Sequence, residues 1–138
     1  MDDIFNKYLN KNKNINRGFR GLIVWQEAIT LFVFTKNKIK NIKTISFKTY
    51  SQIESSSFSI HSSIAEGYCR RHLKEYIQFI NIALASLGEN YSQLFALTIS
   101  GDIEEEWFAE YDKMHYSLEN KFIKLNKENI QKLENKGD

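Results

Sequence analysis

Apolar residues recur at every seventh position over residues 73–98, a spacing typical of a long helix that packs lengthwise against other helices. One row consists of Leu73, Ile80, Leu87 and Leu94. The other row consists of Ile77, Leu84, Tyr91 and Thr98. The chain has no proline and only six glycines, whereas an all-β protein of 138 residues would need many tight turns built from them. A few long helices are therefore expected.

Three further segments have helical periodicity, and we expect helices over about residues 21–39, 47–66 and 102–127. The first is apolar on two adjacent faces, so one face would pack inside the bundle and the other against a second subunit. The last opens on Asp102 with Glu105 three residues later, which resembles a capping box. Four long helices with short connections predict an all-α fold, an antiparallel up-down-up-down four-helix bundle.

Composition divides the chain into three parts. Residues 1–18 are rich in Asn and Lys, and we expect a flexible polar arm with a short helix over residues 4–9. Residues 19–127 would form the bundle, and residues 128–138 a polar C-terminal tail that frays. Gly67 is expected to end or kink the second helix, because glycine readily adopts the left-handed conformation of a helix C-terminus.

Cysteine usage and hydropathy indicate the compartment. Cys69 is the only cysteine, so no intrachain disulfide is possible and a reducing environment is favoured. The N-terminus has no basic segment that leads into an apolar run, and no stretch reaches the roughly 18–20 apolar residues of a membrane span. We expect a soluble, cytoplasmic protein that has no membrane partner.

Charge is distributed unevenly along the chain. Residues 1–74 contain 13 Lys or Arg against 5 Asp or Glu, a net charge of +8. Residues 75–138 contain 6 against 12, a net charge of −6. The basic first half is consistent with a surface that binds a polyanion, and equally with complementary surfaces inside the bundle or between subunits.

Catalytic and metal-binding signatures are absent from the sequence. No glycine-rich phosphate loop, G-x-S-x-G or H-E-x-x-H motif occurs. Cys69 and His72 have the spacing of half a metal site, and no second pair completes it. The run Glu104–Glu106 matches the dipole of a helix start better than a cation loop. An RNA-cleaving enzyme would need Arg and His separated by helical spacing, whereas Arg71 directly precedes His72. We expect no enzyme activity, cofactor or metal.

One basic cluster lies where the second helix is expected to end. Arg70, Arg71 and Lys74 follow Gly67 at the start of the third helix. Arginine forks beside the free N–H groups of a helix start are suited to bind a phosphate. The alternative is that these side chains form ion pairs with Glu66 or with another subunit. The residues favour neither interpretation.

Two sequence motifs lie in the first and second expected helices. Residues 59–71 have the pattern Ser-Ile-x-x-x-Ile-Ala-Glu-Gly-Tyr-x-Arg-Arg. Residues 19–31 have the pattern Phe-x-x-Leu-x-Val-Trp-Gln-x-Ala-x-x-Leu. Both motifs resemble those of the four-helix bundle proteins encoded by 23S rRNA intervening sequences. The resemblance extends over about residues 19–125. It implies structural or assembly roles for Trp25, Glu66, Gly67 and Tyr76.

This resemblance implies a bundle that assembles into a ring, typically a homopentamer. It also implies similarity to the accessory protein of diversity-generating retroelements, which binds nucleic acid and a reverse transcriptase. We therefore expect a non-enzymatic homo-oligomer that binds RNA or a nucleic-acid-handling protein; the rival hypothesis is a protein–protein scaffold. The candidate phosphate-facing residues are Arg70, Arg71, Lys74, Lys36, Lys38, Lys40, Lys43, Lys48, Arg17 and Arg20.

Overall fold

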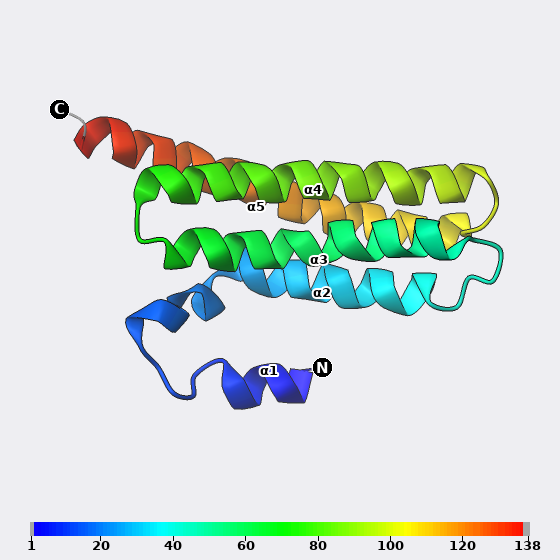
Figure 1. Cartoon of the computed structure of the whole chain (residues 1–138), viewed down its shortest axis with the longest axis horizontal. Coiled ribbons are helices and arrows are strands. Elements are labelled where there is room, and N and C mark those ends of the chain that lie inside the picture. Colours follow the sequence, from blue (N-terminus) through cyan, green and yellow to red (C-terminus); the bar gives the residue numbers. More distant parts are fainter. Residues whose placement is uncertain (1, 137–138) are drawn as a thin grey trace.

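The computed structural model describes residues 2–136, and within them every regular element is a helix. Its elements are α1 (Asp2–Tyr8), the 3-10 helix η1 (Ile15–Gly21), α2 (Ile23–Ile39), α3 (Phe47–Cys69), α4 (Leu73–Ile99) and α5 (Glu105–Lys136). The predicted all-α class is therefore confirmed, and α2 to α5 form a helical bundle (Figure 1). Within residues 2–136, no helix is both long and apolar enough to cross a lipid bilayer.

Each of the helices α2 to α5 packs against two of the other three, so that they enclose one core. Figure 1 shows their connections at alternate ends of the bundle. We call one end the corner end: it carries η1, the α3–α4 turn at residues 70–72 and the last turns of α5. The opposite end, the loop end, carries the connections at residues 40–46 and 100–104.

The predicted apolar rows form the core. Along α4, Ile80, Leu87 and Leu94 are fully buried, as the heptad spacing predicts. In α2, the row that contains Ala28 and Leu31 is buried, while the adjacent aromatic row remains partly exposed. The two-faced character predicted for this helix is therefore present, with the inner face against its own bundle.

A hydrogen-bonded polar layer crosses this core, and the apolar pattern did not predict it. Tyr111 of α5 donates its hydroxyl to Oδ1 of Asn90 at 2.6 Å, and the Asn90 amide donates to Oγ of Ser56 at 3.0 Å. Ser56 in turn donates to Gln93 at 2.7 Å. Because buried polar groups are costly unless paired, these bonds connect α3, α4 and α5 in one specific register.

Small residues on α3 allow α4 to approach closely. Ser86 donates to Oγ of Ser59 at 3.0 Å between the two helices. A Cβ atom at Gly67 would overlap the Cβ atom of Phe79 on α4. The prediction that Gly67 ends the helix was wrong, because α3 continues to Cys69, and the glycine serves interhelical packing.

Two predictions about the last helix were also wrong. The helix begins at Glu105, and Asp102 accepts hydrogen bonds from Ser100 and Thr44 instead of capping it. Its expected end near Lys127 came too early, because α5 remains helical to Lys136 within the segment assigned to a tail.

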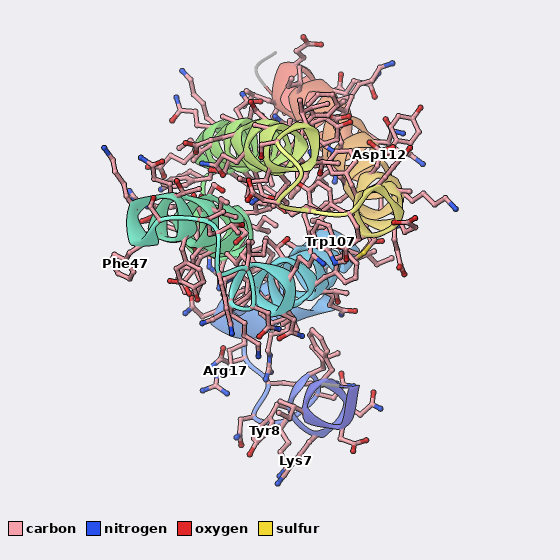
Figure 2. All side chains as sticks on the ribbon, turned by 90° about the vertical axis from the view of Figure 1, so that its right-hand side faces the viewer. Lys7, Tyr8, Arg17, Phe47, Trp107 and Asp112 are labelled. Atoms are coloured by element: carbon pink, nitrogen blue, oxygen red, sulfur yellow. The ribbon has the colours of Figure 1, made fainter. Side chains whose placement is uncertain are left out.

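The N-terminal segment contains more structure than a flexible arm. The short helix expected over residues 4–9 is present as α1, which lies apart from the bundle (Figures 1 and 2). Its connection to η1 is held by the Arg20 guanidinium, which donates to the carbonyl oxygens of Tyr8 at 2.6 Å and Lys11 at 2.7 Å. Phe5 makes an edge contact with Trp25.

Candidate nucleic-acid interface

The turn between α3 and α4 positions the central basic cluster. α3 ends when the N–H groups of Arg70 and Arg71 bond back to Gly67 and Tyr68. Arg71 then adopts φ +66°, a left-handed conformation that is uncommon for residues other than glycine. His72 is extended and precedes α4 without capping it through its side chain. The chain therefore reverses within three residues and places Arg71 at the apex.

The 3-10 helix η1 packs against the end of α3 beside this turn. A Cβ atom at Gly18 would overlap the Tyr68 hydroxyl, so the tip of the Tyr68 side chain lies directly against the Gly18 backbone. The Cys69 thiol donates to the Asn16 carbonyl oxygen at 3.3 Å, and Phe19 packs edge-on against Tyr68. Cys69 is therefore a packing residue of the corner end. These contacts bring Arg17, next to Asn16, to the same end of the molecule.

Of the three clustered cations, one forms ion pairs and two do not. Arg70 lies 3.7 Å from Glu66 and 3.6 Å from Glu75, and its guanidinium stacks over the Phe79 ring. The ion-pair interpretation therefore applies to Arg70. Arg71 and Lys74 are exposed, and no carboxylate of residues 3–136 lies within 4.0 Å of either. Arg71 and Lys74 remain candidates for phosphate contacts.

The other candidates are divided between the two ends of the bundle. Lys36 is paired with Glu54 at 3.1 Å, and Lys38 is paired with Glu104. The Arg20 guanidinium is occupied by backbone carbonyls, so it holds the N-terminal segment. Lys40, Lys43 and Lys48 are exposed around the loop end. Arg17 is exposed at the corner end, and its side chain extends from η1 (Figure 2).

This division excludes one compact site for all ten residues. α3 has 23 residues, which at about 1.5 Å per residue separates its two ends by roughly 34 Å. Arg71 and Lys74 lie near one end of α3, while Lys43 and Lys48 lie near the other. A single phosphate site can therefore include either group and not both.

Sequence reasoning missed two cations of the corner end. Lys132 and Lys136, one turn apart on α5, line the same hollow as Arg71 and Tyr76. Their spacing was visible in the sequence. Their proximity to Arg71 was not, because it depends on α5 continuing past Lys127 beside the start of α4.

Tyr76 is the least usual polar group in this hollow. Its hydroxyl is buried and has no hydrogen-bond partner among the described residues. Burial raises the pKa of Tyr76 to about 12, with a smaller contribution from the neighbouring Tyr68. The hydroxyl therefore stays protonated at neutral pH and remains a hydrogen-bond donor.

The part of the chain that the structure describes contains no group of three His, Cys, Asp or Glu side chains that could hold a metal ion. The corner end instead offers cations, tyrosine rings and the backbone N–H groups of the first turn of α4. These groups suit an anion, and the rings suit an unpaired base.

Comparison with known families agrees with the two motifs. The model of the 23S rRNA-intervening sequence protein family matches residues 20–124. The chain belongs to this family. Searches of curated proteins and of solved structures gave no match.

The structure assigns roles to the motif residues of this family member. Gly67 permits the contact with Phe79, and Glu66 pairs with Arg70. Trp25 is half-buried between Phe19 and Phe5. Apart from Tyr76, which lines the hollow, the motif therefore supports the shape of the corner end.

Proposed function

We propose that this intervening-sequence protein is a non-enzymatic, homo-oligomeric adaptor that binds RNA or a nucleoprotein in the cytoplasm. Its unit is an antiparallel up-down-up-down four-helix bundle, and the assembly is a ring, with a pentamer as the expected size. The observation that carries the proposal is the set of cations at the corner end that form no ion pair with a carboxylate of residues 3–136.

The corner end is suited to a phosphate backbone. Arg71, Lys74 and Arg17 are exposed there, and no described carboxylate lies within 4.0 Å of them. The N–H groups at the start of α4 add a partial positive charge. Contacts of this kind release counterions and bind nucleic acid without reading its sequence.

Self-assembly is supported by apolar side chains on the outside of the bundle. Phe47 is 82% exposed and Phe58 is 52% exposed, both on α3. Phe47 extends away from the core in Figure 2. Phe58 forms an aromatic cluster with Phe32 of α2 and His61. A second copy of the chain that covered these rings would remove apolar surface from water.

The test compares a corner-end variant with a matched control. In the Arg71→Ala/Lys74→Ala variant, affinity for unrelated single-stranded RNAs should fall about uniformly. The log–log salt slope should flatten by about 0.7 for each phosphate that the variant no longer binds. Lys113→Ala/Lys124→Ala removes the same charge from exposed positions of α5 and should leave binding unchanged. Arg70 is kept in both variants because its ion pairs support the turn.

Mass and melting measurements decide how the result is interpreted. Light scattering of the parent protein should give an oligomer, and a stable 16.3 kDa monomer at micromolar concentration would contradict the assembly. If the corner variant keeps its mass, melting temperature and RNA affinity, the site is wrong. If the parent protein binds no RNA, the scaffold hypothesis replaces the adaptor.

A further inference from the structure

The hollow at the corner end is built from three helices. It has a volume of about 310 Å³ and is lined by Arg71, His72, Tyr68, Tyr76, Lys132 and Lys136. The last turns of α5 extend beside the start of α4 and contribute the two lysines. A ligand in this hollow would therefore meet groups that are far apart in the sequence.

Three full positive charges surround the hollow. Arg71, Lys132 and Lys136 are exposed, and no carboxylate of residues 3–136 lies within 4.0 Å of any of them. The nearby Glu75 is engaged by Arg70. A hollow with three cations and no pairing carboxylate among the described residues favours a ligand that carries more than one negative charge.

Two further kinds of hydrogen-bond donor lie at this hollow. The buried Tyr76 hydroxyl has no partner among the described residues, and such groups in folded proteins usually have one. His72 precedes α4 and makes no side-chain cap, so the first N–H groups of the helix receive no bond from it. Arg71 is held at φ +66°, and residues in this conformation are often found at ligand sites.

We propose that this hollow binds the terminal phosphate monoester of a nucleic-acid strand; this inference rests on the proposed nucleic-acid function. A terminal monoester carries a charge of about −1.5 to −2 at pH 7 and has three unsubstituted oxygens. An internal phosphodiester carries one charge, and its two ester oxygens continue into the chain. The terminal group therefore matches the three cations and the hydroxyl, and the strand would continue past Lys74 and Arg17.

The test measures binding of one fluorescent single-stranded RNA with different ends. The full-length protein is titrated with the strand bearing a 5′-phosphate, a 3′-phosphate or hydroxyls at both ends. At least one phosphorylated strand should bind on the order of tenfold more tightly than the hydroxyl strand. Inorganic phosphate should compete with the phosphorylated end and abolish this difference in affinity, which would show that the phosphate group causes it.

Variants assign the effect to the hollow. In Lys132→Ala/Lys136→Ala, the phosphorylated strands should bind no more tightly than the hydroxyl strand, whatever the affinity of this variant for the hydroxyl strand. Tyr76→Phe keeps the ring and should reduce the preference several-fold at unchanged oligomeric mass. The control Lys113→Ala/Lys124→Ala carries the same charge change on α5 and should keep the full preference.

The outcomes separate this inference from the proposed function. Equal binding of all three strands would overturn the terminal-phosphate site and leave the RNA adaptor intact. A preference that survives the Lys132/Lys136 double variant would also overturn this site. If inorganic phosphate binds in calorimetry but no RNA does, both the inference and the adaptor proposal are wrong.

Discussion

The corner end and the loop end both carry lysines and arginines, but they use them differently. At the loop end, Lys38 pairs with Glu104 and the adjoining Lys36 pairs with Glu54. At the corner end, Arg70 takes both nearby glutamates, and the described residues provide no carboxylate within 4.0 Å of Arg71. Lys40, Lys43 and Lys48 of the loop end are exposed and have no ion pair among the described residues. The two ends differ in their hollows: Asp102 and Glu104 line the hollow at the loop end together with Lys38 and Lys43, whereas the hollow at the corner end is lined by three cations and by no carboxylate of the described residues.

This difference shows why charge along the sequence is a poor guide to a binding surface. The basic first half of the chain supplies lysines to the loop end, where the acidic second half supplies Glu104 as a partner. The acidic half in turn supplies Lys132 and Lys136 to the corner end. The pairing of individual side chains, and not the count in each half, decides which surface attracts an anion.

The largest expected effect comes from Leu87, which lies in the core between the two ends. Leu87→Ala should destabilise the protein by about 2–5 kcal/mol, because it leaves a cavity in α4. The chain has one tryptophan near each end, Trp25 at the corner and Trp107 at the loop. Urea unfolding in Trp25→Phe and Trp107→Phe backgrounds reports each end separately.

Coincident transitions in both backgrounds would show that the ends unfold as one unit, as expected for a single core. If Leu87→Ala lowers the unfolding midpoint reported by one tryptophan and not the midpoint reported by the other, the two ends are independent units. An unchanged unfolding midpoint at both would mean that α4 has been placed with the wrong inner face.

Two glycines provide a smaller, end-specific comparison. Gly67→Ala should cost about 1–3 kcal/mol, because its Cβ would overlap the Cβ of Phe79 and force α3 and α4 apart. Gly101, at the loop end, has φ +85° with open space around it, so Gly101→Ala should cost about 1 kcal/mol from backbone strain. Chemical denaturation measures both changes in the free energy of unfolding.

Gly88 is the control for this comparison. It lies in α4 with nothing near its missing Cβ, so Gly88→Ala should stabilise the protein by about 0.5–1 kcal/mol. A destabilisation at Gly67 no larger than that at Gly101 would show that the corner end is not the more closely packed of the two.

The smallest expected effect concerns the Lys38–Glu104 pair. The hydrogen bond that Lys38 donates to Glu104 lowers the pKa of the exposed Glu104 carboxyl. A lowered carboxyl pKa stabilises the folded state at pH values above the ordinary glutamate pKa of 4.5. This stabilisation is lost as the pH falls through the folded-state pKa. Lys38→Met should therefore lower the melting temperature slightly at pH 7, and the difference from the parent should shrink as the pH falls below 4.5 and disappear once Glu104 is protonated in the folded state. A difference that grows on acidification would contradict the ion pair.

The fold was largely predictable because apolar spacing reports it directly. The heptads of residues 73–98 identified Ile80, Leu87 and Leu94 as buried, and they are. The paired motifs identified the family that the family model also matches. Helix ends were predicted less well. Gly67 and Asp102 are typical of helix termini, but tertiary packing uses one for a close contact and the other in a turn.

The candidate site was predictable only in part. The sequence identified the Arg70–Lys74 cluster, but it did not distinguish paired from unpaired cations, since pairing depends on side-chain geometry. Arg20 was assigned to phosphate and instead holds the carbonyls of Tyr8 and Lys11. Lys132 and Lys136 were assigned to a tail, because polar composition alone does not show that a helix continues.

The polar layer of Asn90, Ser56 and Tyr111 affects which misfolded arrangements are available. Heptad repeats allow helices to slip past one another by one or two turns and still bury nearly the same apolar area. A slipped bundle here would leave these three buried groups without partners, at about 1–3 kcal/mol each. The layer thus penalises such competitors during folding and lets a chain with so repetitive an apolar pattern reach one native alignment.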